Sequence, residues 1–170
     1  MDIKALFMGL AFAFMWSSAF TSARMIVADA PPLMALSLRF LISGLIGVGI
    51  ALALGQTWRL TRNQWRATFI FGICQNAIYL GLNFVAMQWI EASVAAIIAS
   101  TMPLLVALVG WIGFGDRIRP LGMAGLVAGV LGVTLIMGAR LQGGVDPFGA
   151  LLCVIGVASL TVATLAVRGA

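Results

Sequence analysis

The sequence predicts an all-α fold, a bundle of several helices that span a membrane. Hydrophobic residues make up 62% of the 170 residues, charged residues make up 9%, and the mean hydropathy is +1.12. A soluble domain carries roughly a quarter charged residues. The apolar residues also fall into blocks of about 20, the length that a helix needs to cross a hydrocarbon core of about 30 Å. Lipid is therefore the expected solvent for most of the surface.

Six apolar blocks predict six transmembrane helices, separated by charged or proline-containing breaks. The predicted helices cover residues 6–23, 33–54, 67–89, 93–114, 121–137 and 148–167. The connections are short, and residues 138–147 form the one before the last helix. Short connections predict that consecutive helices run antiparallel.

The distribution of Lys and Arg predicts the orientation, because positively charged short loops stay in the cytoplasm. With a cytoplasmic N-terminus, Arg24 and Arg140 lie on the outer side. The inner side then collects Lys4, Arg59, Arg62, Arg66, Arg117, Arg119 and Arg168. This topology explains the net charge of +5. No basic stripe interleaved with aromatic residues is present, so nucleic acid is not an expected partner.

Glycines recur at helical spacing in the fifth block, at Gly122, Gly125, Gly129 and Gly132. Small residues let two membrane helices approach closely, and Gly125 and Gly129 form a GxxxG motif. These glycines are predicted to pack helices together rather than to form a site.

The residues that carry catalysis are scarce. The chain has no His and one Tyr, and its five acidic residues lie outside or at the ends of the blocks. No paired carboxylates, metal-binding cluster or nucleophile–base pair is therefore predicted within the membrane. Cys74 and Cys153 lie in apolar blocks without a CxxC spacing and are predicted to be small core residues. We expect no enzyme, metal or cofactor.

Neutral polar side chains inside the third block are the first candidates for a binding site. Asn76, Tyr79 and Asn83 are three and four residues apart, so on an α-helix they share one face. Such a stripe either binds a neighbouring helix or lines a wet cavity and hydrogen-bonds a small polar solute.

Three further features add candidates in the other blocks. Trp16 lies too deep for an interfacial anchor and is predicted at a cavity, while Ser17 and Ser18 beside it can bond back to their own helix. Ser100 precedes a break that Pro103 causes by removing a backbone donor; the break is either a simple kink or part of a cavity. Arg39, inside the second block, either extends to the headgroups or faces the bundle.

Two groups of residues carry a resemblance to a known family. The first comprises residues 15–20 (MWSSAF), Pro31-Pro32 and 38–40 (LRF). The second comprises 78–80, 86–87, 91–100, Pro103-Leu104 and Gly115-Asp116-Arg117. Together they resemble EamA-type members of the drug/metabolite transporter superfamily, whose glycine-rich fifth span is similar to residues 125–132. The family usually has Glu at the position of Asp116. The resemblance covers residues 6–137.

The resemblance implies ten helices in two five-helix repeats of inverted topology, a central cavity and alternating access. Residues 1–137 would form the first repeat and 148–167 the first helix of the second, so the rest of the second repeat would be missing from this chain. The implied protein lies in a bacterial inner membrane and exports amino acids or related small metabolites. The residues expected to bind the substrate are Trp16, Arg39, Asn76, Tyr79, Asn83 and Ser100.

Two alternatives compete with a carrier. A non-transporting membrane subunit would assemble with a partner through its glycine faces. A small-multidrug-type exporter with dual topology is disfavoured, because the chain lacks an intramembrane carboxylate and its arginines lie on one side.

Overall fold

A computed structural model describes residues 3–57, 59–141 and 144–168. Within these ranges the chain is all-α without strands, and six helical spans are long and apolar enough to cross a membrane. The predicted multi-span helical bundle is thereby confirmed. The helices are α1 (Ile3–Asp29), α2 (Pro32–Ala53), α3 (Arg62–Phe71), the π-helix η1 (Gly72–Leu80), α4 (Gly81–Ala86), α5 (Ala92–Ala99), α6 (Met102–Phe114), α7 (Pro120–Leu141) and α8 (Pro147–Ala166). The third span comprises α3, η1 and α4, and the fourth comprises α5 and α6.

Each predicted range overlaps one of these spans, and the largest differences lie at helix ends. Helix α1 continues beyond residue 23 to Asp29 and stops just before the proline pair at 31–32. Helix α3 begins at Arg62 because Thr61 and Gln64 form a capping box: the Thr61 N–H donates to Gln64 Oε1 at 2.9 Å and the Gln64 N–H donates to Thr61 Oγ1 at 3.3 Å. A search for apolar blocks does not include polar residues that extend a helix in this way.

The predicted connection 138–147 is wrong in its first part. Helix α7 remains helical to Leu141, and residues 142–143 lie outside the described residues. The last span begins at Pro147, where the Asp146 side chain accepts a hydrogen bond from the Gly149 N–H at 2.8 Å. An acidic N-cap followed by proline at the first helical position is a standard helix start.

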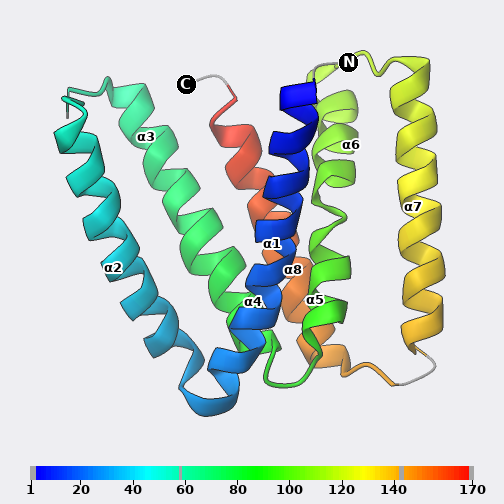
Figure 1. Cartoon of the computed structure of the whole chain (residues 1–170). Helices are drawn as coiled ribbons and strands as arrows, with labels where there is room; N and C mark the ends of the chain where they lie inside the picture. The colour runs from blue at the N-terminus through cyan, green and yellow to red at the C-terminus, as the bar shows by residue number, and fades with distance from the viewer. Residues whose placement is uncertain (1–2, 58, 142–143, 169–170) are drawn as a thin grey trace.

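Helix α8 lies at the centre of the bundle. In Figure 1, α1 crosses in front of α8, while α2 and α7 lie on the two outer sides and both termini lie at the same end. Helix α8 contacts α3, η1, α4, α5 and α6. Its buried residues follow one helix face: Gly149, Cys153, Gly156, Val157, Leu160, Thr161 and Ala163. Small residues on this face let η1 and α4 come close.

Two glycines of α8 define how close that approach is. A Cβ atom on Gly149 would lie 2.7 Å from Ile90 Cγ2 and 3.3 Å from the Ala86 carbonyl oxygen. A Cβ atom on Gly156 would lie 3.0 Å from Asn83 Nδ2. A larger residue at Gly149 would therefore clash, and one at Gly156 would require the Asn83 side chain to shift.

The glycines of α7 behave less uniformly than the sequence predicts. A Cβ atom on Gly129 would lie 3.1 Å from Leu104 Cδ2 of α6, and one on Gly122 would lie 3.2 Å from Ile118 Cγ2 in the preceding turn. At Gly125 and Gly132 no described heavy atom would lie within 4 Å. Helix α7 contacts α5 and α6, and the GxxxG motif is packed at Gly129 and unpacked at Gly125.

The predicted break in the fourth span is present between α5 and α6. The Ser100 hydroxyl donates to the Ile97 carbonyl at 2.6 Å, and the Thr101 hydroxyl donates to the Ile98 carbonyl at 2.7 Å. Side-chain hydroxyls of the same span therefore bond to carbonyl groups beside the break. The break is therefore a kink that hydroxyl groups of the same span stabilise.

Candidate solute-binding cavity

A cavity of about 180 Å³ lies between α1, α2 and the η1–α4 segment, inside the part of the chain that spans the membrane. Four of the six predicted substrate-binding residues line it: Trp16, Arg39, Tyr79 and Asn83. The other lining residues are Ala19, Phe20, Ala23, Gln75, Leu80, Phe84 and Met87. The cavity thus combines aromatic rings, one guanidinium, two amides and a phenol.

The π-helical geometry of η1 decides which polar residues reach this cavity. A π-helix bonds residue i to i+5 and so has more residues per turn than an α-helix. Side chains three apart, such as Asn76 and Tyr79, then point in different directions. Asn76 lines a separate cavity of about 410 Å³ against α2, together with Leu36 and Phe40. The predicted common face is therefore wrong at Asn76.

Gln75 is the residue that sequence reasoning missed. It lies four residues before Tyr79 and eight before Asn83, and all three line the same cavity. The available signal was an amide in an apolar block at α-helical spacing from Tyr79 and Asn83. π-helical segments are rare and frequently mark functional sites.

Asn83 is used mainly by the protein itself. Its side chain is 1% exposed; Nδ2 donates to the Tyr79 carbonyl at 2.8 Å, and Oδ1 accepts from the Cys153 thiol at 3.4 Å. The second contact joins α4 to α8, which is the helix-binding use of a polar group in a membrane. Asn83 positions the cavity lining and has little capacity left for a solute.

Unlike the Asn83 amide, the Tyr79 hydroxyl makes no hydrogen bond within the described part of the chain. Tyr79 is 1% exposed, and its hydroxyl has no hydrogen-bond partner among the described residues. The Trp16 indole is near enough to interact with it, but not in hydrogen-bonding geometry. A buried hydroxyl without a partner costs about 1–3 kcal/mol. The hydroxyl thus keeps unused hydrogen-bonding capacity in a residue that lines the cavity.

Aromatic rings of α1 form one wall. Trp16 stacks on Phe12 with 6.2 Å between ring centroids and meets the edge of Phe20 at 5.9 Å. The hydroxyls of Ser17 and Ser18 instead donate to carbonyls of their own helix, at 2.7 and 2.9 Å. Of Trp16, Ser17 and Ser18, only Trp16 lines the cavity.

Arg39 supplies the charge. It lies about 10 Å along the axis of α2 from Pro32 by helical rise, and it lines the cavity. No ion pair or hydrogen bond joins its side chain to another described residue. Arg39 is also exposed, so its guanidinium is accessible to an anionic group, and charged side chains inside membrane spans commonly serve such partners.

Two further residues, Ser100 and Arg24, have contacts that were not predicted from the sequence. Ser100 is exposed, donates to its own helix and does not line the cavity. Arg24, which the charge pattern assigned only to topology, donates to the carbonyl of Met87 at the end of α4. It thereby ties α1 to a residue of the cavity lining.

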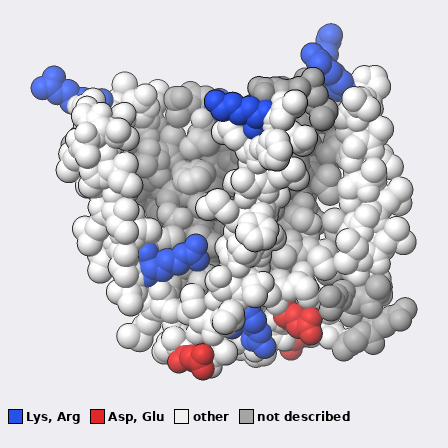
Figure 2. Space-filling view, viewed as in Figure 1, with Lys and Arg blue, Asp and Glu red and all other residues white. Residues whose placement is uncertain are grey.

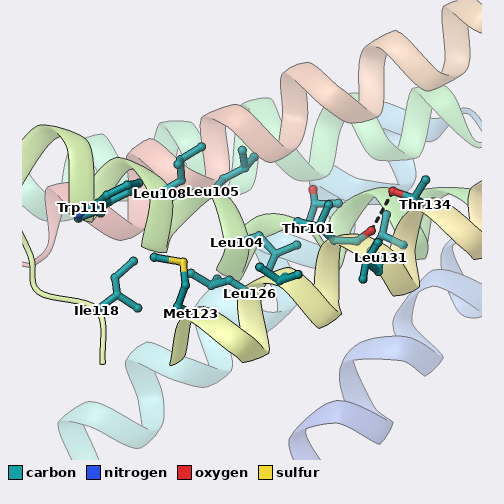
Figure 3. A pocket seen from close by; sticks show the side chains of 13 residues that line it. Thr101, Leu104, Leu105, Leu108, Trp111, Ile118, Met123, Leu126, Leu131 and Thr134 are labelled. Atoms are coloured by element: carbon teal, nitrogen blue, oxygen red, sulfur yellow. Dashed lines mark hydrogen bonds between the residues drawn. The ribbon is translucent and has the colours of Figure 1, made fainter. Parts of the chain in front are cut away.

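A different, mostly apolar cavity of about 470 Å³ lies between α6 and α7 (Figure 3). Leu104, Leu108 and Trp111 line it from α6, and Met123 and Leu131 line it from α7. The Thr134 hydroxyl beside it donates to the Val130 carbonyl at 2.9 Å. No charged side chain lines this cavity, so it offers a polar solute no partner of opposite charge. No group of three or more metal-binding side chains occurs in the described part of the chain.

Comparison with known proteins agrees with this architecture. The chain is 26% identical over 151 residues to the uncharacterized transporter YvbV of Bacillus subtilis, a match of 89% of this chain and 49% of that protein. It is 31% identical over 143 residues to the uncharacterized inner membrane transporter YedA of Escherichia coli (83% and 45%). It is 31% identical over 113 residues to the aromatic amino acid exporter YddG of Ancylobacter novellus (66% and 39%).

The chain spans less than half the length of each of these relatives. No solved structure matches it. The model of the EamA-like transporter family matches residues 3–138, which include every helix from α1 to α6 and nearly all of α7. The chain is thus an integral membrane protein that belongs to the EamA-like transporter family.

Proposed function

We propose that the protein carries a small amphipathic organic solute, of amino-acid-like chemistry, across the membrane by alternating access. The observation that carries this proposal is the cavity that combines the unpaired Arg39 guanidinium, the unpartnered Tyr79 hydroxyl and the ring of Trp16. Polar groups inside a membrane span are costly unless they serve a partner or a pathway.

The lining chemistry supports a solute with one anionic end and one apolar end. A carboxylate pairs with a guanidinium through charge-assisted hydrogen bonds. Trp16 and Phe20 offer apolar area to a side chain, and Gln75 and Tyr79 offer hydrogen bonds to an amine or hydroxyl. The name of the relative YddG, an aromatic amino acid exporter, supports the same class and the export direction.

The size of the cavity supports a small solute. Pockets for drug-sized ligands measure about 300–1,000 Å³, and this one measures about 180 Å³. Because the chain spans less than half of its relatives, we propose that further helices, arranged as an inverted second repeat, complete the cavity. The irregular third and fourth spans, with η1 and the α5–α6 break, are the segments where a helix can bend during alternating access.

Gln75 and Asn76 provide a matched pair for the test. They are adjacent amides, but only Gln75 lines the cavity. Export of amino acids from vesicles that contain the full-length protein should fall about ten-fold or more for Gln75→Leu, the effect of one lost hydrogen bond to the solute. Asn76→Leu should export at close to the original rate.

Equal amounts of both variants in the membrane are the control for insertion. Equal export by Gln75→Leu and the original protein would contradict the assignment of this cavity. A loss confined to Asn76→Leu would move the solute site to the cavity against α2.

A further inference from the structure

A third cavity, of about 540 Å³, lies between α3, α6 and α8 at the end of the bundle that holds both termini. Four of its lining residues, Asn63, Arg66, Ala67 and Ile70, have the spacing of one α-helix face. The remaining lining residues, Phe114, Leu165, Ala166 and Arg168, come from the ends of α6 and α8. The cavity is separate from the one that Tyr79 and Arg39 line.

Its polar side is basic. Arg168 donates two hydrogen bonds to Asp116, at 2.5 and 2.7 Å, and its guanidinium lies 5.5 Å from the centre of the Phe114 ring. These contacts hold Arg168 in place while Asp116 offsets its charge. Arg66 has no ion pair with any described residue, so the cavity keeps a net positive charge. Figure 2 shows further Lys and Arg side chains at this end of the face it presents.

Its other side is apolar. Ala67 and Ile70 lie deeper along α3 than Arg66, and Leu165 and Ala166 face them from α8. Arg66 lies in the first turns of the third candidate span and Arg168 lies two residues beyond the last one, while Ala67 and Ile70 lie further into the third span. A cavity with this order of groups matches a molecule with an anionic head and a hydrocarbon tail.

We propose that this cavity binds one anionic phospholipid, with its phosphate at Arg66 and Arg168 and part of an acyl chain along Ala67 and Ile70. Basic pockets between transmembrane helices bind anionic lipid headgroups in this way. The phosphate chemistry is shared with free phosphate, but the apolar side of the cavity selects the lipid. The proposal does not depend on the transported solute.

The test uses native mass spectrometry of the purified full-length protein in neutral detergent. Phosphatidylglycerol, phosphatidylcholine with the same acyl chains, and inorganic phosphate are added in separate arms. One phosphatidylglycerol should stay bound, phosphatidylcholine should be retained at least about five-fold less, and inorganic phosphate should not displace the bound lipid. Arg66→Gln should lower phosphatidylglycerol retention about five-fold, whereas Arg66→Lys, which keeps the charge, should retain most of it.

Arg62→Gln is the matched control, since Arg62 lies one turn earlier on α3 and does not line the cavity. It should retain the lipid, and all variants should share one unfolding midpoint in phosphatidylcholine. Equal losses for Arg62→Gln and Arg66→Gln would overturn the proposal in favour of general surface attraction. Retention of phosphatidylcholine equal to that of phosphatidylglycerol, or displacement of the lipid by inorganic phosphate, would also overturn it.

Discussion

At the scale of single residues, the Asn83 amide and the Tyr79 hydroxyl, both in residues that line the cavity, differ in their hydrogen bonding. The Asn83 amide bonds to the Tyr79 carbonyl and the Cys153 thiol, whereas the Tyr79 hydroxyl bonds to no described residue. The Asn83 amide therefore stabilises the packing of α4 against α8, whereas the unpartnered Tyr79 hydroxyl lowers the stability of the fold. Substitutions at the two positions should therefore separate stability from transport.

Tyr79→Phe should lower transport about ten-fold while raising the free energy of unfolding by up to about 1 kcal/mol, because it removes a buried hydroxyl without a partner. Asn83→Leu should instead lower the free energy of unfolding by about 1–3 kcal/mol, since it removes two hydrogen bonds. Solute flux in vesicles and unfolding in detergent measure the two effects. A Tyr79→Phe protein that transports normally would show that the hydroxyl does not serve the solute.

The sequence singled out Trp16, Arg39, Tyr79 and Asn83 because each is a polar or aromatic residue at an unusual depth in an apolar block. All four line one cavity in the structure, and their role in binding a substrate stays a prediction. It misassigned Asn76, which lies in the π-helix η1 and lines another cavity, and it missed Gln75, although Gln75 stands at helical spacing from Tyr79 and Asn83. It also missed Arg24, whose partner is a backbone carbonyl 63 residues away.

At the scale of elements, α8 supports the irregular η1. The Ser159 hydroxyl donates to the Cys74 carbonyl, within η1, at 3.0 Å. The change between α-helical and π-helical bonding disturbs the regular bonding of backbone carbonyls near its ends, and groups from a neighbouring helix can bond to them. Hydropathy was sufficient to predict the six spans. It could not predict the hydrogen bond between Ser159 and Cys74, because that bond depends on how two spans pack together.

Ser159→Ala should lower the free energy of unfolding by about 1 kcal/mol, the worth of one hydrogen bond. Ser22→Ala is the control, because the Ser22 hydroxyl donates only to the Ser18 carbonyl of its own helix, at 3.1 Å. Chemical unfolding in mixed micelles measures both. Equal stabilities for the two variants would mean that Ser159 does not support η1.

Gly149→Ala and Gly125→Ala should have opposite effects. The added methyl group at Gly149 would meet Ile90 and the Ala86 carbonyl, and overpacking of this kind costs about 1–3 kcal/mol. At Gly125 the methyl group meets no described atom within 4 Å, so the higher helix propensity of Ala should stabilise α7 by up to about 1 kcal/mol. The unfolding midpoints of the two variants check this. A destabilised Gly125→Ala protein would reveal a partner on that face of α7.

At the scale of the whole molecule, the Asp116–Arg168 pair joins the α6–α7 turn to the end of α8. Hydrogen bonds from the Arg168 guanidinium hold the pKa of the Asp116 carboxyl below its ordinary value of 3.8. A lowered pKa in the folded state means that the pair contributes stability above the ordinary value and loses that contribution as the pH falls through the lowered value.

The unfolding midpoint should therefore fall more steeply below about pH 4 in the original protein than in Asp116→Asn, which lacks the titrating group. Because both side chains are exposed, about 1 M salt should narrow the difference between the two proteins. Parallel curves at every pH would contradict a stabilising role for the pair.

Charge at the two ends of the bundle predicts that the N-terminus is cytoplasmic. In a variant with Cys74 and Cys153 replaced by Ala, a cysteine at Thr57 should react only with a reagent that enters the cell. A cysteine at Asp29, at the opposite end, should react with one that does not. The reverse pattern would invert the predicted orientation.

The central position of α8 has a consequence for biosynthesis. The ribosome releases α8 after the five spans that precede it, so Cys74 and Asn83 enter the bilayer before Ser159 and Cys153 exist to bond them. Until then η1 has no neighbour on the side that α8 later covers. Proteolysis and misassembly around η1 are therefore expected until the sixth span has been synthesised and covers that side.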